Sequence, residues 1–202
     1  MFITFEGIDG SGKSTQIDLL RRHLDDAGER VEVFREPGGT ILSEQVRSLL
    51  LDPDSRINPV TELLLFSAAR SQLMSEKVLP LLEEGAFVIL DRFFDSTTAY
   101  QGYGRNSLPL EEIERINRAA SHHRAPDLTF YLAISLEEAR SRTEGMEQDR
   151  MERSGEAFYR RVIEGFEELA RRENRFLRLD ATLPPDELHG RILAAVDLPG
   201  TR

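Results

Sequence analysis

Short apolar runs alternate with longer segments of helical periodicity along the chain. Five runs are apolar enough for buried strands, at residues 2–5, 31–34, 87–90, 128–132 and 176–179. The segments between them carry apolar residues three or four positions apart, which predicts helices. These predicted helices cover residues 13–27, 41–51, 58 to about 84, 110–122, a segment from 136, 157–171 and a segment from 184.

This alternation predicts an α/β fold in which a five-stranded parallel sheet carries helices on both faces. Pro80 should bend or break the long helix that begins at Asn58 and Pro59. No repeat or linker divides the chain, so residues 1–202 are expected to form one domain. Residues 143–155 are rich in Arg, Glu and Gly and lack apolar periodicity. We expect this segment, called the lid below, to be mobile.

Composition narrows the functional classes. A net charge of −10 argues against broad binding to nucleic acid, which requires a basic surface. No apolar run approaches the ~18 residues of a membrane span, so no membrane partner is expected. The chain has no cysteine, which excludes disulfides and thiolate metal sites and fits a cytoplasmic location.

The clearest motif is Gly-Ile-Asp-Gly-Ser-Gly-Lys-Ser, from Gly7 to Ser14. It matches the G-x-x-x-x-G-K-[ST] phosphate loop and stands between a predicted strand and a predicted helix. Glycines permit a tight loop whose N–H groups bind phosphate oxygens, and the helix adds its positive N-terminal end. Lys13 is expected to reach the β- and γ-phosphates of ATP, and Ser14 to ligate Mg²⁺. The alternative is a glycine-rich turn with a chance lysine, but the strand and helix context favours a phosphate site.

Asp91 directly follows the apolar strand at 87–90. The second magnesium-holding carboxylate of a phosphate-loop enzyme is expected at such a position. A lone aspartate there is commonly a turn residue, but the neighbouring Arg92 favours a functional role.

A phosphate loop by itself does not separate kinases from switch GTPases or motor ATPases. The chain has no Asn-Lys-x-Asp sequence, which GTPases use to read guanine. A non-catalytic nucleotide-binding module stays open as an alternative at this point. A second set of arginine and aromatic residues at predicted strand ends favours an enzyme with a second substrate.

A series of ordered segments gives the chain a specific resemblance. The segments are Phe-Glu-Gly-Ile-Asp-Gly-Ser-Gly-Lys-Ser at 5–14, Arg-Glu-Pro-Gly-Gly-Thr at 35–40, Leu-Phe-Ser-Ala-Ala-Arg at 65–70, Asp-Arg-Phe-Phe-Asp-Ser at 91–96, Ala-Tyr-Gln-Gly-Tyr at 99–103, Asp-Arg-Met-Glu at 149–152 and Asp-Ala-Thr at 180–182. With these segments the chain resembles the thymidylate kinase family, in its bacterial form, over nearly its whole length.

The resemblance implies a phosphate-loop kinase fold and the Mg²⁺-dependent reaction of ATP with dTMP to give ADP and dTDP, a step toward dTTP. It also implies a homodimer. The implied ATP-binding residues are Gly7, Ile8, Asp9, Gly10, Ser11, Gly12, Lys13, Ser14, Thr15, Arg142 and Arg153. The implied dTMP-binding residues are Arg35, Glu36, Arg47, Phe66, Arg70, Arg92, Ser96, Thr97, Tyr100 and Gln101. The implied catalytic residues are Lys13, Arg92, Arg150 and Asp9, with Ser14 and Asp91 at the metal.

In this assignment Phe66 stacks on thymine, and Arg70 hydrogen-bonds the edge of the base. The two residues lie four positions apart on a predicted helix and therefore share a face. From the spacing by itself, Phe66 could equally be a core residue and Arg70 a partner in a surface ion pair. The resemblance favours the ligand-binding interpretation.

The lid carries the remaining implied role. Members of the family place an arginine either in the phosphate loop or in the lid, and this loop has Asp9 and no arginine. The lid is therefore expected to supply one, with Arg150 first and Arg142 and Arg153 behind it. This lid has fewer arginines before Asp149 than many bacterial relatives.

The acceptor would be a phosphate dianion, which needs no general base. A deoxynucleoside kinase is the nearest rival. Such an enzyme must deprotonate a neutral hydroxyl with a carboxylate base, and Glu36 could serve as that base. A kinase acting on another nucleoside monophosphate is the other rival.

Overall fold

The computed structural model describes residues 1–145, 147 and 149–196, so residues 146 and 148 of the lid lie outside the described part. Its sheet consists of parallel strands in the order β2-β3-β1-β4-β5. The strands are β1 (Phe2–Glu6), β2 (Val31–Arg35), β3 (Phe87–Asp91), β4 (Leu128–Ala133) and β5 (Phe176–Asp180). The predicted five-stranded parallel sheet is confirmed.

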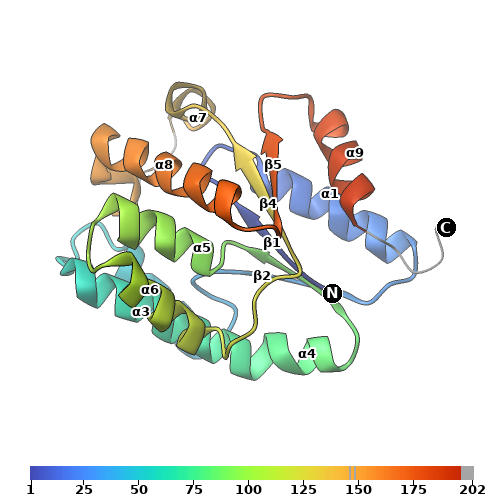
Figure 1. Ribbon diagram of the computed structural model, residues 1–202, viewed down its shortest axis with the longest axis horizontal. Helices are drawn as coiled ribbons and strands as arrows, with labels where there is room; N and C mark the ends of the chain where they lie inside the picture. Colours follow the sequence, from blue (N-terminus) through green and yellow to red (C-terminus); the bar gives the residue numbers. More distant parts are fainter. Residues whose placement is uncertain (146, 148, 197–202) are drawn as a thin grey trace.

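Helices cover both faces of the sheet (Figure 1). The helices α1 (Lys13–Asp26) and α9 (Pro185–Ala195) pack together on one face. The other face carries α8 (Glu156–Arg172) and most of the remaining helices. These are α2 (Ile41–Leu51), α3 (Pro59–Leu73), η1 (Met74–Val78), α4 (Leu79–Glu83), α5 (Phe94–Thr97), η2 (Thr98–Gly104) and α6 (Leu110–Ala120). The helix α7 (Leu136–Arg142) precedes the lid, and η3 (Glu152–Ser154) lies within it.

Two helical features differ from the sequence expectation. A bend or break was expected near Pro80. The structure instead has a π-helical segment, η1, directly before the short helix α4 that contains Pro80. The segment from Phe94 to Gly104 was not expected to be regular, yet it forms α5 followed by the π-helix η2. Its two glycines permit close packing, since a Cβ on Gly104 would lie 2.6 Å from Cε2 of Phe158. Packing against α8 therefore supports a helix that its composition disfavours.

The carboxyl ends of the strands meet at one edge of the sheet, where an open α/β sheet binds its ligands. Strand pairing places Asp91 level with Phe5 on one side and with Arg35 on the other. A buried core beneath this edge includes Ile3, Phe5, Ile89, Phe130 and Leu132. No helix in the described ranges combines the length and the apolar character that a membrane span requires.

Candidate active site

The phosphate loop joins β1 to α1 in a conformation that requires glycine. Gly7, Gly10 and Gly12 have φ angles of 140°, 81° and 92°. A Cβ on Gly10 would lie 2.6 Å from the carbonyl oxygen of Ala139, closer than two such atoms approach. Sterics and backbone conformation thus fix the glycine pattern of the motif.

Lys13 begins α1 and folds back over the loop. Its Nζ donates to the carbonyl oxygens of Gly7 and Ile8 at 3.1 and 3.2 Å and lies 4.0 Å from Asp9. Burial, together with the charge of Arg92, lowers the pKa of Lys13. The lysine is therefore held against the loop where a nucleotide phosphate would bind.

A cavity of about 520 Å³ opens at the loop. Ser14 and Asp91 both line it, and Oδ1 of Asp91 is buried without a hydrogen-bond partner. Such an orphaned carboxylate oxygen, beside a hydroxyl, suits a hard cation such as Mg²⁺. Among the described residues, no group of three or more His, Cys, Asp or Glu side chains forms a metal cage.

Arg92 follows β3 and lies between this cavity and a second one. Its φ of 70° is unusual for a residue other than glycine. Its guanidinium donates to the Gly7 carbonyl at 2.9 Å, to Asp9 Oδ1 at 2.7 Å and to Ser96 Oγ at 3.3 Å. Burial disfavours the charge on Asp9, but Arg92 and Lys13 outweigh it and lower the pKa of Asp9 to about 2. Arg92 is thus fixed between β3 and the phosphate loop.

The second cavity has a volume of about 120 Å³ and shares Asp9, Glu36, Arg47 and Arg92 with the first. Of the predicted dTMP-binding residues, all but Arg35 line it: Glu36, Arg47, Phe66, Arg70, Arg92, Ser96, Thr97, Tyr100 and Gln101. Arg35 lines the first cavity and lies 3.2 Å from Glu44. Residues from four segments of the chain therefore converge on one space beside the phosphate loop.

Arg70 is buried, with 1% of its surface exposed, so the surface ion pair weighed from the sequence does not form. Its Nε donates to Glu36 Oε2 at 2.8 Å, and its NH2 group donates to Thr97 Oγ1 at 2.9 Å. Burial raises the pKa of Glu36 to about 7, although Arg70 opposes this shift. Oε1 of Glu36 is buried without a partner.

Aromatic side chains form the walls of the second cavity. Phe66 is half-buried and leaves part of its ring available. Tyr100 is buried, its hydroxyl has no hydrogen-bond partner, and Arg92 lies 5.1 Å from its ring centre. Phe93 packs against Phe2 in the core and also reaches the cavity. A flat ligand would fit among such side chains.

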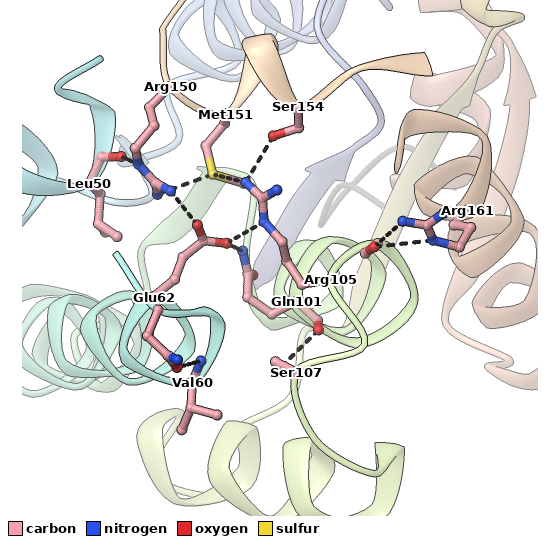
Figure 2. A network of polar contacts seen from close by, with 12 residues as sticks. Leu50, Val60, Glu62, Gln101, Arg105, Ser107, Arg150, Met151, Ser154 and Arg161 are labelled. Carbon is pink, nitrogen blue, oxygen red and sulfur yellow. Dashed lines mark hydrogen bonds and ion pairs between the residues drawn. The ribbon is translucent and has the colours of Figure 1, made fainter. Parts of the chain in front are cut away.

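The lid arginines lie in different places. Arg150, the first choice from the sequence, does not point toward the phosphate loop: it donates to Glu62 at 2.6 Å and to the Leu50 carbonyl at 2.7 Å (Figure 2). The buried carboxylate of Glu62 pairs with its positive charge. Arg142 donates to the Gly10 carbonyl at 3.4 Å and lines the loop cavity. Arg153 lines a neighbouring cavity between the lid and α7.

Sequence reasoning missed three buried polar residues of this region. Glu6 accepts hydrogen bonds from the Phe93 amide and Ser96, and Asn117 accepts one from Arg70. Glu62 binds Gln101 and two arginines. The sequence contained a pattern that could have identified Asn117 and Glu62. Asn117 shares the inward face of α6 with apolar residues, and Glu62 lies four positions before Phe66 on α3.

Comparison with known proteins decides the family. The family model described as thymidylate kinase matches residues 5–192. A thymidylate kinase from Chlorobaculum parvum is 51% identical, covering 97% of this chain and 95% of its own. The chain belongs to the thymidylate kinase family. A thymidylate kinase from Caldanaerobacter subterraneus is 44% identical, with 97% and 94% covered.

Solved structures agree with this assignment. The crystal structure of thymidylate kinase from Ehrlichia chaffeensis superposes with a TM-score of 0.78 at 35% identity, covering 96% of each chain. The thymidylate kinase resemblance drawn from the sequence motifs and the phosphate-loop kinase fold are therefore confirmed. Membership in the thymidylate kinase family places the protein among the phosphotransferases that use ATP.

Proposed function

We propose that the protein transfers the γ-phosphoryl group of ATP to dTMP, giving ADP and dTDP for dTTP synthesis. The observation that carries this proposal is the pair of adjoining cavities that share Arg92 and Asp9. One cavity contains the phosphate loop and the other contains aromatic and amide side chains. Two phosphorylated ligands bound in them would meet at Arg92.

ATP would bind with its phosphates on residues 7–15, near Lys13 and Arg142. The dTMP base would lie in the second cavity against Phe66, with polar contacts from Arg70, Thr97 and Gln101. Arg92, with Arg35 and Arg47, would hold the dTMP phosphate. Three arginines suit a dianion because guanidinium groups bind phosphate oxygens in pairs.

Mg²⁺ fits the loop cavity, where the free oxygen of Asp91 and the hydroxyl of Ser14 would hold it. When bound, the ion would offset negative charge on the phosphates. Since the described residues form no metal cage, nucleotide phosphates and water would complete its shell.

The protein's own contribution is position and charge. The acceptor phosphate is already an adequate nucleophile, so catalysis requires that two anions be brought together. Lys13 is buried against the loop and Arg92 lies between the cavities. The arginine proposed for the transferred group is Arg142, at the end of α7 next to the lid, because Arg150 is bound to Glu62.

One observation favours a second candidate, a deoxynucleoside kinase. Glu36 lines both cavities and has a buried oxygen without a partner. With a pKa near 7, this carboxylate could accept a proton from a sugar hydroxyl.

Three further features belong to the proposal. The chain would act as one kinase domain, residues 1–202, with residues 143–155 as a lid that closes over ATP. It would form a homodimer through α2 and α3, which pack together and expose Ile41, Leu42, Leu49 and Leu64. The absence of cysteine fits work in the cytoplasm.

A coupled ADP-release assay over dTMP, dUMP, dCMP, dGMP and thymidine tests the acceptor. We expect the highest kcat/KM with dTMP. Activity on thymidine but not on dTMP would favour the deoxynucleoside kinase. ATP binding without transfer to any acceptor would indicate a non-catalytic module.

A further inference from the structure

Glu62 is a buried carboxylate at the start of α3 that phosphoryl transfer does not use. Only 1% of its surface is exposed. It accepts hydrogen bonds from Gln101 at 2.9 Å, Arg105 at 3.2 Å and Arg150 at 2.6 Å (Figure 2). Burying a charge is costly unless it is paired and hydrogen-bonded, so this position calls for a reason.

The first consequence concerns the lid. Arg150 is bonded to both Glu62 and the Leu50 carbonyl, and Arg105 links Glu62 to Ser154 Oγ at 2.8 Å. Residues 150 and 154 are thereby attached to α2, α3 and the end of η2. Glu62 is the point where these attachments meet in Figure 2.

The second consequence concerns the amide of Gln101. A carboxylate flanked by two guanidinium groups accepts hydrogen bonds, so the nitrogen end of this amide must face Glu62. Gln101 also lines the substrate cavity. The amide oxygen is therefore the end that Gln101 can offer to a ligand there.

This orientation distinguishes pyrimidine bases. Thymine carries an N–H between its two carbonyl groups and can donate to an amide oxygen. Cytosine has an unprotonated acceptor nitrogen at the same ring position, so it would face the oxygen of Gln101 as acceptor against acceptor. A buried mismatch of this kind lowers affinity substantially.

We propose that Glu62 is a positioning residue that sets base selectivity, by fixing the amide of Gln101 and by anchoring the lid through Arg150. Two walls of the substrate cavity then depend on one carboxylate, since Gln101 lies on one side and Asp149 and Met151 lie on the lid side. The inference rests on the proposed use of dTMP.

Glu62→Gln tests it, because a glutamine can donate or accept and leaves the Gln101 amide free to turn. The measurement is the affinity of dTMP and of dCMP by calorimetry, without ATP. We expect the dTMP-to-dCMP affinity ratio to fall at least tenfold. An unchanged ratio would overturn the inference. Wild-type protein that binds dTMP but does not phosphorylate it would refute only the proposed reaction, and wild-type protein that binds neither nucleotide would refute both.

Asp95→Asn is the matched control. Asp95 is equally buried and pairs with Arg175 at 2.7 and 2.8 Å, but it does not line the substrate cavity. We expect it to lower the melting temperature and leave the ratio unchanged. An equal fall of the ratio in this variant would assign the Glu62 effect to stability and overturn the inference.

Two more variants complete the test. Arg150→Met should weaken dTMP and dCMP alike, since it releases the lid but keeps the bond from Gln101 to Glu62. Glu62→Asp keeps the charge and withdraws it from Gln101 by one methylene, so its ratio should fall about threefold even if Glu62→Gln does not fold. A wild-type ratio in Glu62→Asp would contradict the inference.

Discussion

Arg92 shows how much of the site depends on a single side chain. It has a left-handed backbone conformation, and its guanidinium bonds the Gly7 carbonyl and the Asp9 carboxylate, both in the phosphate loop. Backbone strain of this kind costs on the order of 1–3 kcal/mol and persists where surrounding contacts hold it. Here those contacts hold Arg92 where it lines both the phosphate-loop cavity and the second cavity.

Arg92→Lys should therefore lower kcat/KM for dTMP roughly 10- to 100-fold. Lysine keeps the charge but cannot bond Asp9, the Gly7 carbonyl and a phosphate with one planar group. Steady-state kinetics over dTMP and ATP would measure the loss. Arg178→Lys, at a surface ion pair with Glu167, is the control and should leave kcat/KM unchanged. Equal activity of Arg92→Lys and wild type would contradict a role for Arg92 in binding or catalysis.

Glu6 makes a pH prediction at the same scale. Burial, with the nearby negative charge of Asp95, raises its pKa from 4.5 to about 8. The folded state thus binds this proton more tightly than the unfolded state does. The free energy of unfolding should fall as the pH rises from about 4.5 to 8 and change no further through this group above that range.

Glu6→Gln should remove that part of the pH dependence. Between pH 5 and pH 9 the free energy of unfolding of the variant, relative to that of the wild type, should rise by about 2–4 kcal/mol. Urea unfolding at the two pH values gives the comparison, and it uses the change with pH because the substitution has its own fixed effect. Parallel stability profiles of the two proteins would contradict the assignment.

At the scale of elements, the sequence predicts what local periodicity encodes. The apolar runs and helical spacings predicted all the strands and most of the helices, with ends within a few residues. The segment 94–104 escaped because it is rich in Ser, Thr and Gly and becomes helical through contact with α8. Local patterns carry no signal of such contacts.

The candidate site likewise has one part that the sequence predicts and another that it does not. The phosphate loop is a contiguous motif and could be recognised from the sequence by itself. The second cavity brings together residues from distant segments, so only the family resemblance identified them. Glu62 is absent from that set because its partners, Gln101, Arg105 and Arg150, meet it only in the fold. The contact with Glu62 also points Arg150, which was expected to act from the lid, away from the phosphate loop.

Gly104→Ala tests the packing of η2 against α8. The new methyl would lie 2.6 Å from the Phe158 ring and 2.9 Å from Val162, so stability should fall by about 1–3 kcal/mol. Gly190→Ala, in α9, meets no atom within 4 Å and should stabilise by about 0.5–1 kcal/mol. Thermal or urea unfolding of both variants gives the answer. Similar effects in the two would refute the tight contact.

Arg142→Ala tests the arginine that borders the lid. Its side chain reaches the Gly10 and Ala181 carbonyls from the end of α7. If it stabilises the transferred group, kcat should fall about 100-fold while the dissociation constant of dTMP changes less than threefold. Single-turnover kinetics with separately measured binding would show this difference. Equal losses in rate and in dTMP affinity would exclude a role specific to the transition state.

At the scale of the whole molecule, the sheet gathers the functional groups at one edge and leaves apolar side chains on α2 and α3. Ile41, at 84% exposed, and Leu64, at 52%, face solvent in a single chain. An exposed apolar face on two neighbouring helices is typical of an interface between protomers.

The double variant Leu49→Glu and Leu64→Glu should convert the proposed dimer to a monomer. Two charges placed at an apolar interface oppose association, whereas they remain hydrated in the single chain. Analytical ultracentrifugation at micromolar concentration measures the mass, and Arg115→Glu on the exposed side of α6 serves as the control. A monomeric wild type would contradict the proposed dimer.

The proposed function requires that the γ-phosphoryl group pass from ATP to the phosphate of dTMP. The most direct test incubates the protein with Mg²⁺, dTMP and ATP labelled at the γ-phosphorus, and then separates the nucleotides. We expect label in the terminal phosphate of dTDP and none in inorganic phosphate beyond background. Label released only as inorganic phosphate, with dTMP left unused, would contradict it.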